Sequence, residues 1–273
     1  METKNLNDLH TNYAMVFDLD ETLGHFSQIA TFWNLTNHYL SYSILDNKIF
    51  FKLLDSFQDF LRPNILKLLY NLKRKKQRGI CDYVIIFTNN MHKQWVEMIK
   101  EYFHYRLKYP LFDKIIAGFR DYDNQVEICR TSHDKSHKDF INCSKLPLNT
   151  KICFLDDLEH HQMENPNVLY IHIKPYHHHE KFTKMVDIFY KQNREIFLEH
   201  NRVNTYENYK KYIINSSKKY QLEYLKKSNT EKNIDYMLSQ QIIKEINRFF
   251  KNRPKNFTVK KKKKLFNKTI KLL

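Results

Sequence analysis

Two aspartates, Asp18 and Asp20, directly follow the short apolar run at residues 13–17. Side chains two residues apart in an extended segment leave the same face, so both carboxylates are predicted to face one space. Their mutual repulsion and their desolvation are unfavourable unless a cation or a reaction uses them. A carboxylate can attack phosphorus to form an aspartyl-phosphate, and a second carboxylate can act as general acid and then as general base. The pattern therefore predicts that Asp18 is a nucleophile and that Asp20 is its acid–base partner.

Two further apolar runs also end in polar side chains. Thr88 follows residues 83–87, and the pair Asp156 and Asp157 follows residues 151–155. Carboxylate oxygens are the ligands that Mg²⁺ prefers, so this pair is predicted to complete a magnesium site with the first two aspartates. The threonine hydroxyl is predicted to donate a hydrogen bond to a phosphoryl oxygen.

A lysine is needed beside the nucleophile, because an ammonium group would neutralise both the carboxylate and the phosphoryl oxygens. Lys138 precedes the third apolar run and is the residue predicted for this role. Lys135 lies three residues earlier and is the alternative.

These side chains need strands that place them along one edge of a sheet. The three apolar runs are short and rich in β-branched or aromatic residues, as are strands covered on both faces. Apolar residues at helical spacing lie between them, at residues 56–77 and 89–107. Strands alternating with helices predict an α/β, Rossmann-like domain with a parallel central sheet and a site at the carboxyl ends of its strands. Residues 26–54, with aromatic-rich runs around Asp46 and Asn47, are predicted to form a small flap insertion built on a hairpin.

Charge divides the chain into a nearly neutral body and a basic end. Residues 200–273 carry 20 Lys and Arg against 5 Asp and Glu, or +15 of the net charge of +16, which leaves +1 for residues 1–199. Residues 1–199 are predicted to be the α/β domain, 200–254 a basic helical extension, and 255–273 a basic tail that contains five consecutive lysines. A basic end suggests an acidic partner, so nucleic acid is a candidate partner of this extension.

The order of these motifs resembles that of the haloacid dehalogenase (HAD) superfamily. The matching pattern is Asp-x-Asp-x-Thr after one strand, Thr after a second, a lysine, and Asp-Asp after a third; the carboxylate at position 20 resembles its phosphatase branch. The stretch DLDETLGH at residues 18–25 is similar to the FCP/SCP-like branch, the phosphatases of the RNA polymerase II C-terminal domain. RPNILKLL at 62–69, IIFTNN at 85–90 and HKDF at 137–140 resemble further segments of that branch.

The resemblance implies a Mg²⁺-dependent phosphatase that works through an aspartyl-phosphate. It implies that Mg²⁺ is held by the Asp18 carboxylate, the backbone carbonyl of Asp20, and one residue of the third motif, with Asp157 favoured over Asp156. Four residues near the motifs are predicted to bind substrate: Thr22, Asn89, Arg62 and Arg130.

Three functions fit these observations. The first is a phosphatase for phospho-Ser/Thr proteins, because a small flap would leave the site open to macromolecules. The second is a phosphatase for nucleic-acid ends or nucleotides, with residues 200–273 holding the polynucleotide. The third is a non-catalytic module that binds phosphoproteins or nucleic acid. A steep loss of affinity with salt separates the second from the first, and turnover of an aryl phosphate excludes the third.

Composition excludes several other classes of protein. No apolar run approaches the ~20 residues of a membrane span, and the first residues lack the apolar stretch of a secretory signal. We therefore expect a cytoplasmic or nuclear protein with no membrane partner. The low-glycine composition, rich in Asn, Lys and Ile, suggests an AT-rich genome such as that of a large DNA virus or a protist.

Cysteines and histidines give no pattern that predicts a further metal site. The four cysteines form no CxxC pair, which predicts reduced thiols and neither a zinc site nor a disulfide framework. The adjacent histidines at 177–179 are not spaced for one metal ion and are predicted to be exposed in a loop. His25 is predicted to support the geometry of its own loop.

Overall fold

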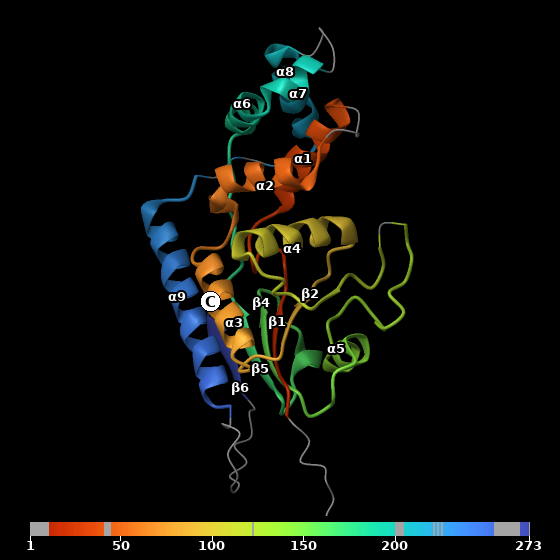
Figure 1. Ribbon diagram of the computed structural model, residues 1–273, viewed down its shortest axis with the longest axis vertical. Coiled ribbons are helices and arrows are strands. Elements are labelled where there is room, and N and C mark those ends of the chain that lie inside the picture. The colour runs from red at the N-terminus through yellow and green to blue at the C-terminus, as the bar shows by residue number, and fades with distance from the viewer. Residues whose placement is uncertain are drawn as a thin grey trace, which may run out of the picture.

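A six-stranded parallel sheet forms the centre of the protein. The computed structural model describes residues 11–40, 45–121, 123–199, 205–220, 222, 224, 226–253 and 268–272. The strand order is β3-β2-β1-β4-β5-β6. The strands are β1 (Tyr13–Phe17), β2 (Tyr83–Phe87), β3 (Lys114–Ile116), β4 (Lys151–Asp156), β5 (Val168–Ile173) and β6 (Lys268–Leu272). The prediction of an α/β domain with a parallel central sheet is confirmed (Figure 1).

Helices cover both faces of this sheet (Figure 1). They are α1 (Ser27–Tyr39), α2 (Asn47–Ser56), α3 (Ile65–Gln77), α4 (Lys93–Leu107), α5 (His137–Ser144), α6 (Phe182–Gln192), α7 (Arg194–Glu199), α8 (Tyr206–Ser217) and α9 (Asn229–Lys251). Helix α5 packs on one face, and α3, α4 and α9 pack on the other.

Alternation along β1 explains why both faces are covered. Tyr13, Met15 and Phe17 belong to the larger apolar core, whereas Ala14 and Val16 belong to the smaller core under α5. All five residues are buried. A strand with apolar side chains on both faces is stable only between two layers, so the run at 13–17 specifies a central strand.

The strand order reverses beside β1. The chain passes from β1 to β2 on one side and places β4 on the other, where Val16 pairs with Phe154. The Asp18 backbone N–H donates to the Leu155 carbonyl at 2.9 Å, so the pairing continues to the end of both strands. Open α/β sheets bind ligands beside such a reversal, outside the carboxyl ends of the strands.

The predicted hairpin flap at residues 26–54 is wrong, because this segment forms helices. Asp46 does not begin a turn between strands; its side chain accepts a hydrogen bond from the Ile49 N–H at 2.9 Å and caps α2. Phe50, Leu53 and Leu54 are buried at helical spacing. The aromatic runs that indicated strands are thus the buried faces of helices, since both patterns place apolar residues close together.

Instead of a small flap, five helices form a lobe beyond the carboxyl ends of the strands. This helical lobe consists of α1, α2, α6, α7 and α8 and lies at the top of Figure 1. Helices α1 and α2 follow β1 in the chain, whereas α6, α7 and α8 follow β5. The two groups are in contact, because the Tyr209 hydroxyl of α8 lies 2.8 Å from the Thr36 hydroxyl of α1. Phe50 of α2 contacts Trp95 of α4, with ring centroids 5.2 Å apart, which joins the lobe to the sheet layer.

The basic extension is part of the same structure as the sheet. Helix α9 buries Ile246 and Phe249, and the Phe249 ring lies 5.5 Å from that of Tyr13 in the central strand. Arg253 donates to the Asp82 carboxylate at 2.9 Å. The predicted tail at 255–273 contains a sheet strand: β6 pairs in parallel with β5. The five-lysine run lies outside the described residues.

The prediction of reduced thiols is also wrong for two of the four cysteines. Cys129, in the loop before α5, forms a disulfide bond with Cys143 near the end of that helix, while Cys81 and Cys153 are free and buried. The pair is separated by 14 residues and comes together only because α5 folds back on the loop, so a local CxxC pattern could not reveal it. Among the described residues, no helix has the length and apolar character needed to cross a membrane.

Candidate active site

A buried lysine joins two of the predicted carboxylates at the carboxyl ends of β1 and β4. The Lys135 ammonium donates to Asp18 Oδ1 at 2.5 Å and to Asp156 Oδ2 at 2.6 Å. Lys135 is 1% exposed, Asp18 7% and Asp156 0%, so three ionisable groups share one almost dry space. Buried charges of this kind persist only when they are paired, as they are here.

Asp157 completes a cluster of three carboxylates. Oxygen atoms of Asp18, Asp156 and Asp157 all lie within 4.8 Å of one another. The Thr22 hydroxyl donates to Asp157 Oδ1 at 2.8 Å and fixes one oxygen of that group. Three carboxylates facing one lysine leave an excess of negative charge with oxygen donors only, which suits a hard divalent cation such as Mg²⁺.

Asp20 is not among the carboxylates of this cluster, and its side chain binds a residue that the sequence analysis missed. Asn90 donates through Nδ2 to Asp20 Oδ2 at 2.8 Å. The Asn90 backbone N–H donates in turn to the Thr88 hydroxyl at 3.1 Å, so one residue positions both predicted catalytic groups. The signal in the sequence was the second asparagine of FTNN, next to the motif threonine.

Burial dominates the electrostatics of the carboxylates. It raises the pKa of Asp18 to about 6, although the Lys135 ammonium opposes the shift. It also raises the pKa of Asp20 to about 6, against the Asn90 hydrogen bond, and raises those of Asp156 and Asp157. Burial alone would lower the pKa of Lys135, but the carboxylates of Asp156 and Asp18 outweigh it and raise that pKa. The lysine therefore stays charged, and Asp20 titrates near neutrality.

The structure corrects the choice of lysine. Lys138, predicted to neutralise the nucleophile, is exposed on α5, whereas Lys135 contacts the Asp18 carboxylate. Ser136 caps α5 by accepting a hydrogen bond from the Asp139 N–H at 3.0 Å. Lys135 is thus the last residue before the cap and points to the sheet edge, while Lys138 follows the helix to its outer side. The start of α5 at Ser136 therefore determines that Lys135, and not Lys138, contacts Asp18.

Two predicted substrate-binding residues instead hold the backbone around the site. Arg62 is 2% exposed and donates to the carbonyls of Thr22, Glu21 and Lys174. Buried arginines commonly bind backbone carbonyls, because these satisfy several of the five N–H donors at once. This guanidinium therefore fixes the loop after β1 rather than facing a substrate.

Arg130 has the same kind of role on the other side of the site. Its guanidinium is 3% exposed and donates to the carbonyls of Thr88 and Ala117 and to Oδ1 of Asn89. Asn89, also predicted to bind substrate, is thus occupied by an arginine in this structure. Thr22, also predicted to bind substrate, donates its hydroxyl hydrogen to the Asp157 carboxylate.

A close backbone contact shapes the loop between β1 and α1. A Cβ atom added at Gly24 would lie 2.5 Å from the Phe60 carbonyl oxygen, so only glycine fits. The same carbonyl accepts a hydrogen bond from the His25 N–H at 2.7 Å. Glu21 adopts a left-handed conformation with φ 55°, which few non-glycine residues take. These features turn the chain sharply and leave Asp18 and Asp20 at the sheet edge.

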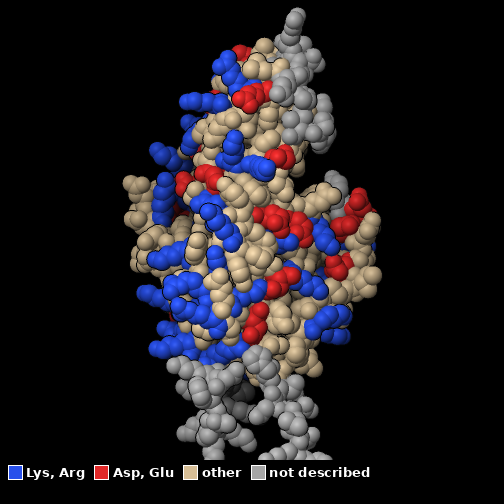
Figure 2. Space-filling model, viewed as in Figure 1, with Lys and Arg blue, Asp and Glu red and all other residues tan. Residues whose placement is uncertain are grey.

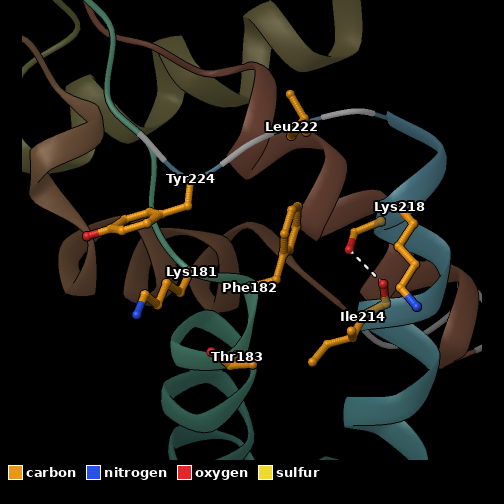
Figure 3. A pocket seen from close by; sticks show the side chains of 8 residues that line it. Lys181, Phe182, Thr183, Ile214, Lys218, Leu222 and Tyr224 are labelled. Carbon is orange, nitrogen blue, oxygen red and sulfur yellow. Dashed lines mark hydrogen bonds between the residues drawn. The ribbon is translucent and has the colours of Figure 1, made fainter. Parts of the chain in front are cut away.

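A pocket in the helical lobe lies away from these carboxylates. It has a volume of about 720 Å³ and is lined by residues of α6, α8 and the segment that follows α8: Lys181, Phe182, Thr183, Ile214, Ser217, Lys218, Leu222 and Tyr224 (Figure 3). Its lining contains no carboxylate and no histidine. It lacks the groups that phosphate chemistry needs, so we place the candidate active site at the carboxylates of β1 and β4.

Comparison with known proteins adds no assignment. No protein-family model matches the chain, and no curated protein is significantly similar to it in sequence.

Proposed function

We propose that this protein is a Mg²⁺-dependent phosphatase of the HAD type, which forms an aspartyl-phosphate on Asp18 and acts on phospho-Ser/Thr proteins. The observation that carries the proposal is the meeting of Asp18, Asp156 and Asp157 with the buried Lys135 at the reversal of strand order. A salt bridge that only stabilises the fold pairs one carboxylate with one cation, whereas three carboxylates lie near Lys135 here. The surplus of carboxylates is explained by a cation and a reaction.

The residues present fit each chemical role. Asp18 attacks phosphorus through a carboxylate oxygen, and Asp20, with its pKa raised to about 6, donates a proton to the departing oxygen. Asp20 then takes a proton from the water that cleaves the acyl-phosphate. Mg²⁺, held by Asp18 and Asp157 and by the Asp20 carbonyl that the family resemblance implies, would neutralise charge on the phosphoryl oxygens. Lys135 favours the ionised form of the nucleophile and would neutralise charge on the same oxygens.

The rim of the site and the family resemblance support a phosphorylated side chain as substrate. The buried carboxylates of Asp18 and Asp157 are 7% and 8% exposed, whereas Asp20 and Asn90 are partly exposed at the rim. A phosphorylated side chain projecting from a larger partner can reach such a recessed group. The similarity of DLDETLGH to the FCP/SCP-like branch supports phosphoserine or phosphothreonine as that side chain.

Turnover tests the chemistry directly. The full chain should hydrolyse an aryl phosphate with Mg²⁺ and should stop when EDTA is added. Asp18→Asn should abolish turnover, while Asp20→Asn should slow it by about 10²–10⁴-fold, the usual contribution of general acid–base catalysis. Full activity of Asp18→Asn would exclude the covalent mechanism. A phosphopeptide panel then tests the substrate class.

Nucleic-acid ends are the second candidate substrate, favoured by charge. Lys and Arg are frequent over the side of the molecule where α9 and α3 lie (Figure 2). Oligonucleotides with 3′- or 5′-phosphates should be included in the panel. Binding that weakens steeply with salt would favour this candidate, because phosphate contacts release counterions. Binding of phosphopeptides or oligonucleotides without any turnover would indicate the non-catalytic module instead.

A further inference from the structure

A second group of metal-ligating side chains lies beside the loop that follows β1. It consists of Glu21, His25 and His177, which each offer one ligand atom, and these atoms lie within 4.8 Å of one another. Glu21 and His25 belong to the loop that carries the candidate nucleophile. His177 belongs to the segment between β5 and α6, more than 150 residues later in the chain.

The His25 ring is oriented as a metal ligand would be. Its Nδ1 lies 2.6 Å from the His178 carbonyl oxygen. A carbonyl can only accept, so this contact requires a proton on Nδ1. It is shorter than the 3.3 Å between Nδ1 and the His178 backbone N–H, which would need the other tautomer, and we therefore assign the lone pair to Nε2. This arrangement, with one ring nitrogen donating to a carbonyl and the other left to ligate, is the usual support of metal-bound histidine. The ring is 5% exposed, so its orientation is fixed by packing.

Two polar groups lie close to Nε2 of His25. Nε2 lies 3.6 Å from Glu21 Oε1 and 3.0 Å from the Ser27 hydroxyl. Two ligands of a tetrahedral zinc ion, each bound at about 2.0–2.1 Å, lie roughly 3.4 Å apart. The histidine and the carboxylate are therefore already near ligand spacing, and the Ser27 hydroxyl can rotate away.

We propose that Glu21, His25 and His177 form a binding site for a transition-metal ion of the zinc class, which lies beside the magnesium site and differs from it in its ligands. Two imidazoles and one carboxylate suit Zn²⁺, whereas the all-oxygen cluster of Asp18, Asp156 and Asp157 suits Mg²⁺. Because His177 is exposed, a fourth position is open to water or another ligand.

The two loops are held together before any ion binds. The Tyr176 N–H donates to the Glu21 carbonyl at 2.9 Å, next to the His25–His178 contact. Lys227 acts electrostatically on His177, but its ammonium pairs with the Asp235 carboxylate. The ligands are therefore arranged in advance, and a bound ion would link the catalytic loop to the start of the helical lobe.

The sequence argument against a histidine metal site is thereby revised. Adjacent histidines cannot share one ion easily, and the structure uses only one of the three, His177. Its companions come from the loop after β1, so sequence spacing carried no signal. His25, predicted to support loop geometry, does so through Nδ1 and offers Nε2 in addition.

Metal titration of the purified full chain tests the site. Zn²⁺ is titrated against a chromophoric chelator in excess Mg²⁺, and Co²⁺ absorption reports the ligand geometry. We expect one Zn²⁺ per chain and visible d–d bands of a four- or five-coordinate Co²⁺ site. His177→Ala and Glu21→Gln remove proposed direct ligands, so each should weaken Zn²⁺ binding by at least the roughly 10–100-fold that loss of an outer-shell partner costs. His161→Ala is the matched control, because His161 is exposed and outside the group.

Circular dichroism confirms that each variant is folded. Two results would overturn the proposal. The first is unchanged Zn²⁺ affinity in folded His177→Ala and Glu21→Gln. The second is loss of Zn²⁺ in Asp157→Asn with binding kept in His177→Ala, which would place zinc in the all-oxygen cluster. None of these readouts uses turnover, so they stand apart from the proposed phosphatase activity.

Discussion

Replacing Lys135 by methionine separates its electrostatic role from a merely structural one. The ammonium makes two charge-assisted hydrogen bonds, 2.5 Å to Asp18 and 2.6 Å to Asp156, at 1% exposure. Methionine keeps much of the aliphatic volume and removes the charge. Two buried carboxylates then lose their cationic partner and keep only backbone donors, such as the Leu158 N–H at 2.9 Å from Asp156. Such a loss costs about 3–5 kcal/mol of the free energy of unfolding.

Catalysis should suffer independently of stability. Without the ammonium, the phosphoryl oxygens lose a donor that faces them in the transition state, which typically slows turnover by about 10²–10³-fold. Metal binding should change in the opposite direction. Removing one positive charge beside three carboxylates strengthens their attraction for Mg²⁺, so the Mg²⁺ affinity of folded Lys135→Met should be kept or raised.

Three measurements on one preparation of Lys135→Met test the role assigned to this lysine. They are urea unfolding in EDTA, turnover of an aryl phosphate in saturating Mg²⁺, and Mg²⁺ binding by calorimetry. Lys138→Met is the matched control, because Lys138 is exposed on α5 and should leave all three unchanged. Near-normal turnover in folded Lys135→Met, or loss of turnover in Lys138→Met alone, would refute the assignment of the lysine.

Three shorter predictions concern groups around the site. Asn90→Ala should slow turnover about tenfold, since Asp20 loses the donor at 2.8 Å that positions it, and kcat should fall more than KM rises. Burial raises the pKa values of Asp18 and Asp20 to about 6, so turnover of an alkyl phosphate should rise as the proposed nucleophile ionises and fall as the proposed general acid loses its proton, with a maximum near pH 6. Asp20→Asn should remove the fall at higher pH, and a rate unaffected by pH between 5 and 8 would contradict this reasoning. Cys143→Ser should lower the free energy of unfolding by about 2–3 kcal/mol, and dithiothreitol should destabilise the wild type but not this variant if the disulfide with Cys129 is present in solution.

The strands and the polar residues at their ends could be predicted together, because each short apolar run in the sequence is followed directly by polar residues. The apolar runs at 13–17, 83–87 and 151–155 coincide with β1, β2 and most of β4. Each is short, apolar on both faces and followed at once by polar groups, a pattern that few other elements show. Parallel strands then bring Asp18 and Asp157 together without further information, since their carboxyl ends share one edge.

Features that depend on contacts between distant segments could not be predicted. The hairpin predicted around Asp46 failed because aromatic residues fit strands and buried helix faces equally well, and only packing against α4 decides between them. The lysine was misplaced because the start of α5 at Ser136 sets which side chain faces the sheet. The strand β6 was missed because its five residues follow a run of lysines and gain their structure only from β5.

The C-terminal residues need two separate tests, since β6 lies among them. Removing residues 254–273 deletes a strand whose Ile270 and Leu272 pack against the larger core. It also removes the hydrogen bond from the Lys174 N–H to the Leu272 carbonyl at 2.8 Å. Truncation therefore changes stability and charge together. Replacing Lys260–Lys264 by glutamine changes the charge alone and is the matched variant.

Truncation should lower the free energy of unfolding by about 1–3 kcal/mol, from partial burial of two aliphatic side chains less the entropy of ordering them. It should spare turnover of an aryl phosphate, because β6 is the edge strand and lies beyond β4 and β5 from the nucleophile. The glutamine variant should keep the stability and the turnover of the wild type. If the five lysines contact duplex DNA, the slope of log K against the logarithm of the salt concentration should be shallower in the glutamine variant than in the wild type. The difference should be up to about 4.5, since each phosphate contact contributes about 0.9 to the slope. An unchanged salt slope would show that this run does not bind nucleic acid. Loss of aryl phosphate turnover in the folded glutamine variant would show instead that the basic end takes part in the chemistry, against the division between a catalytic body and a recognition segment.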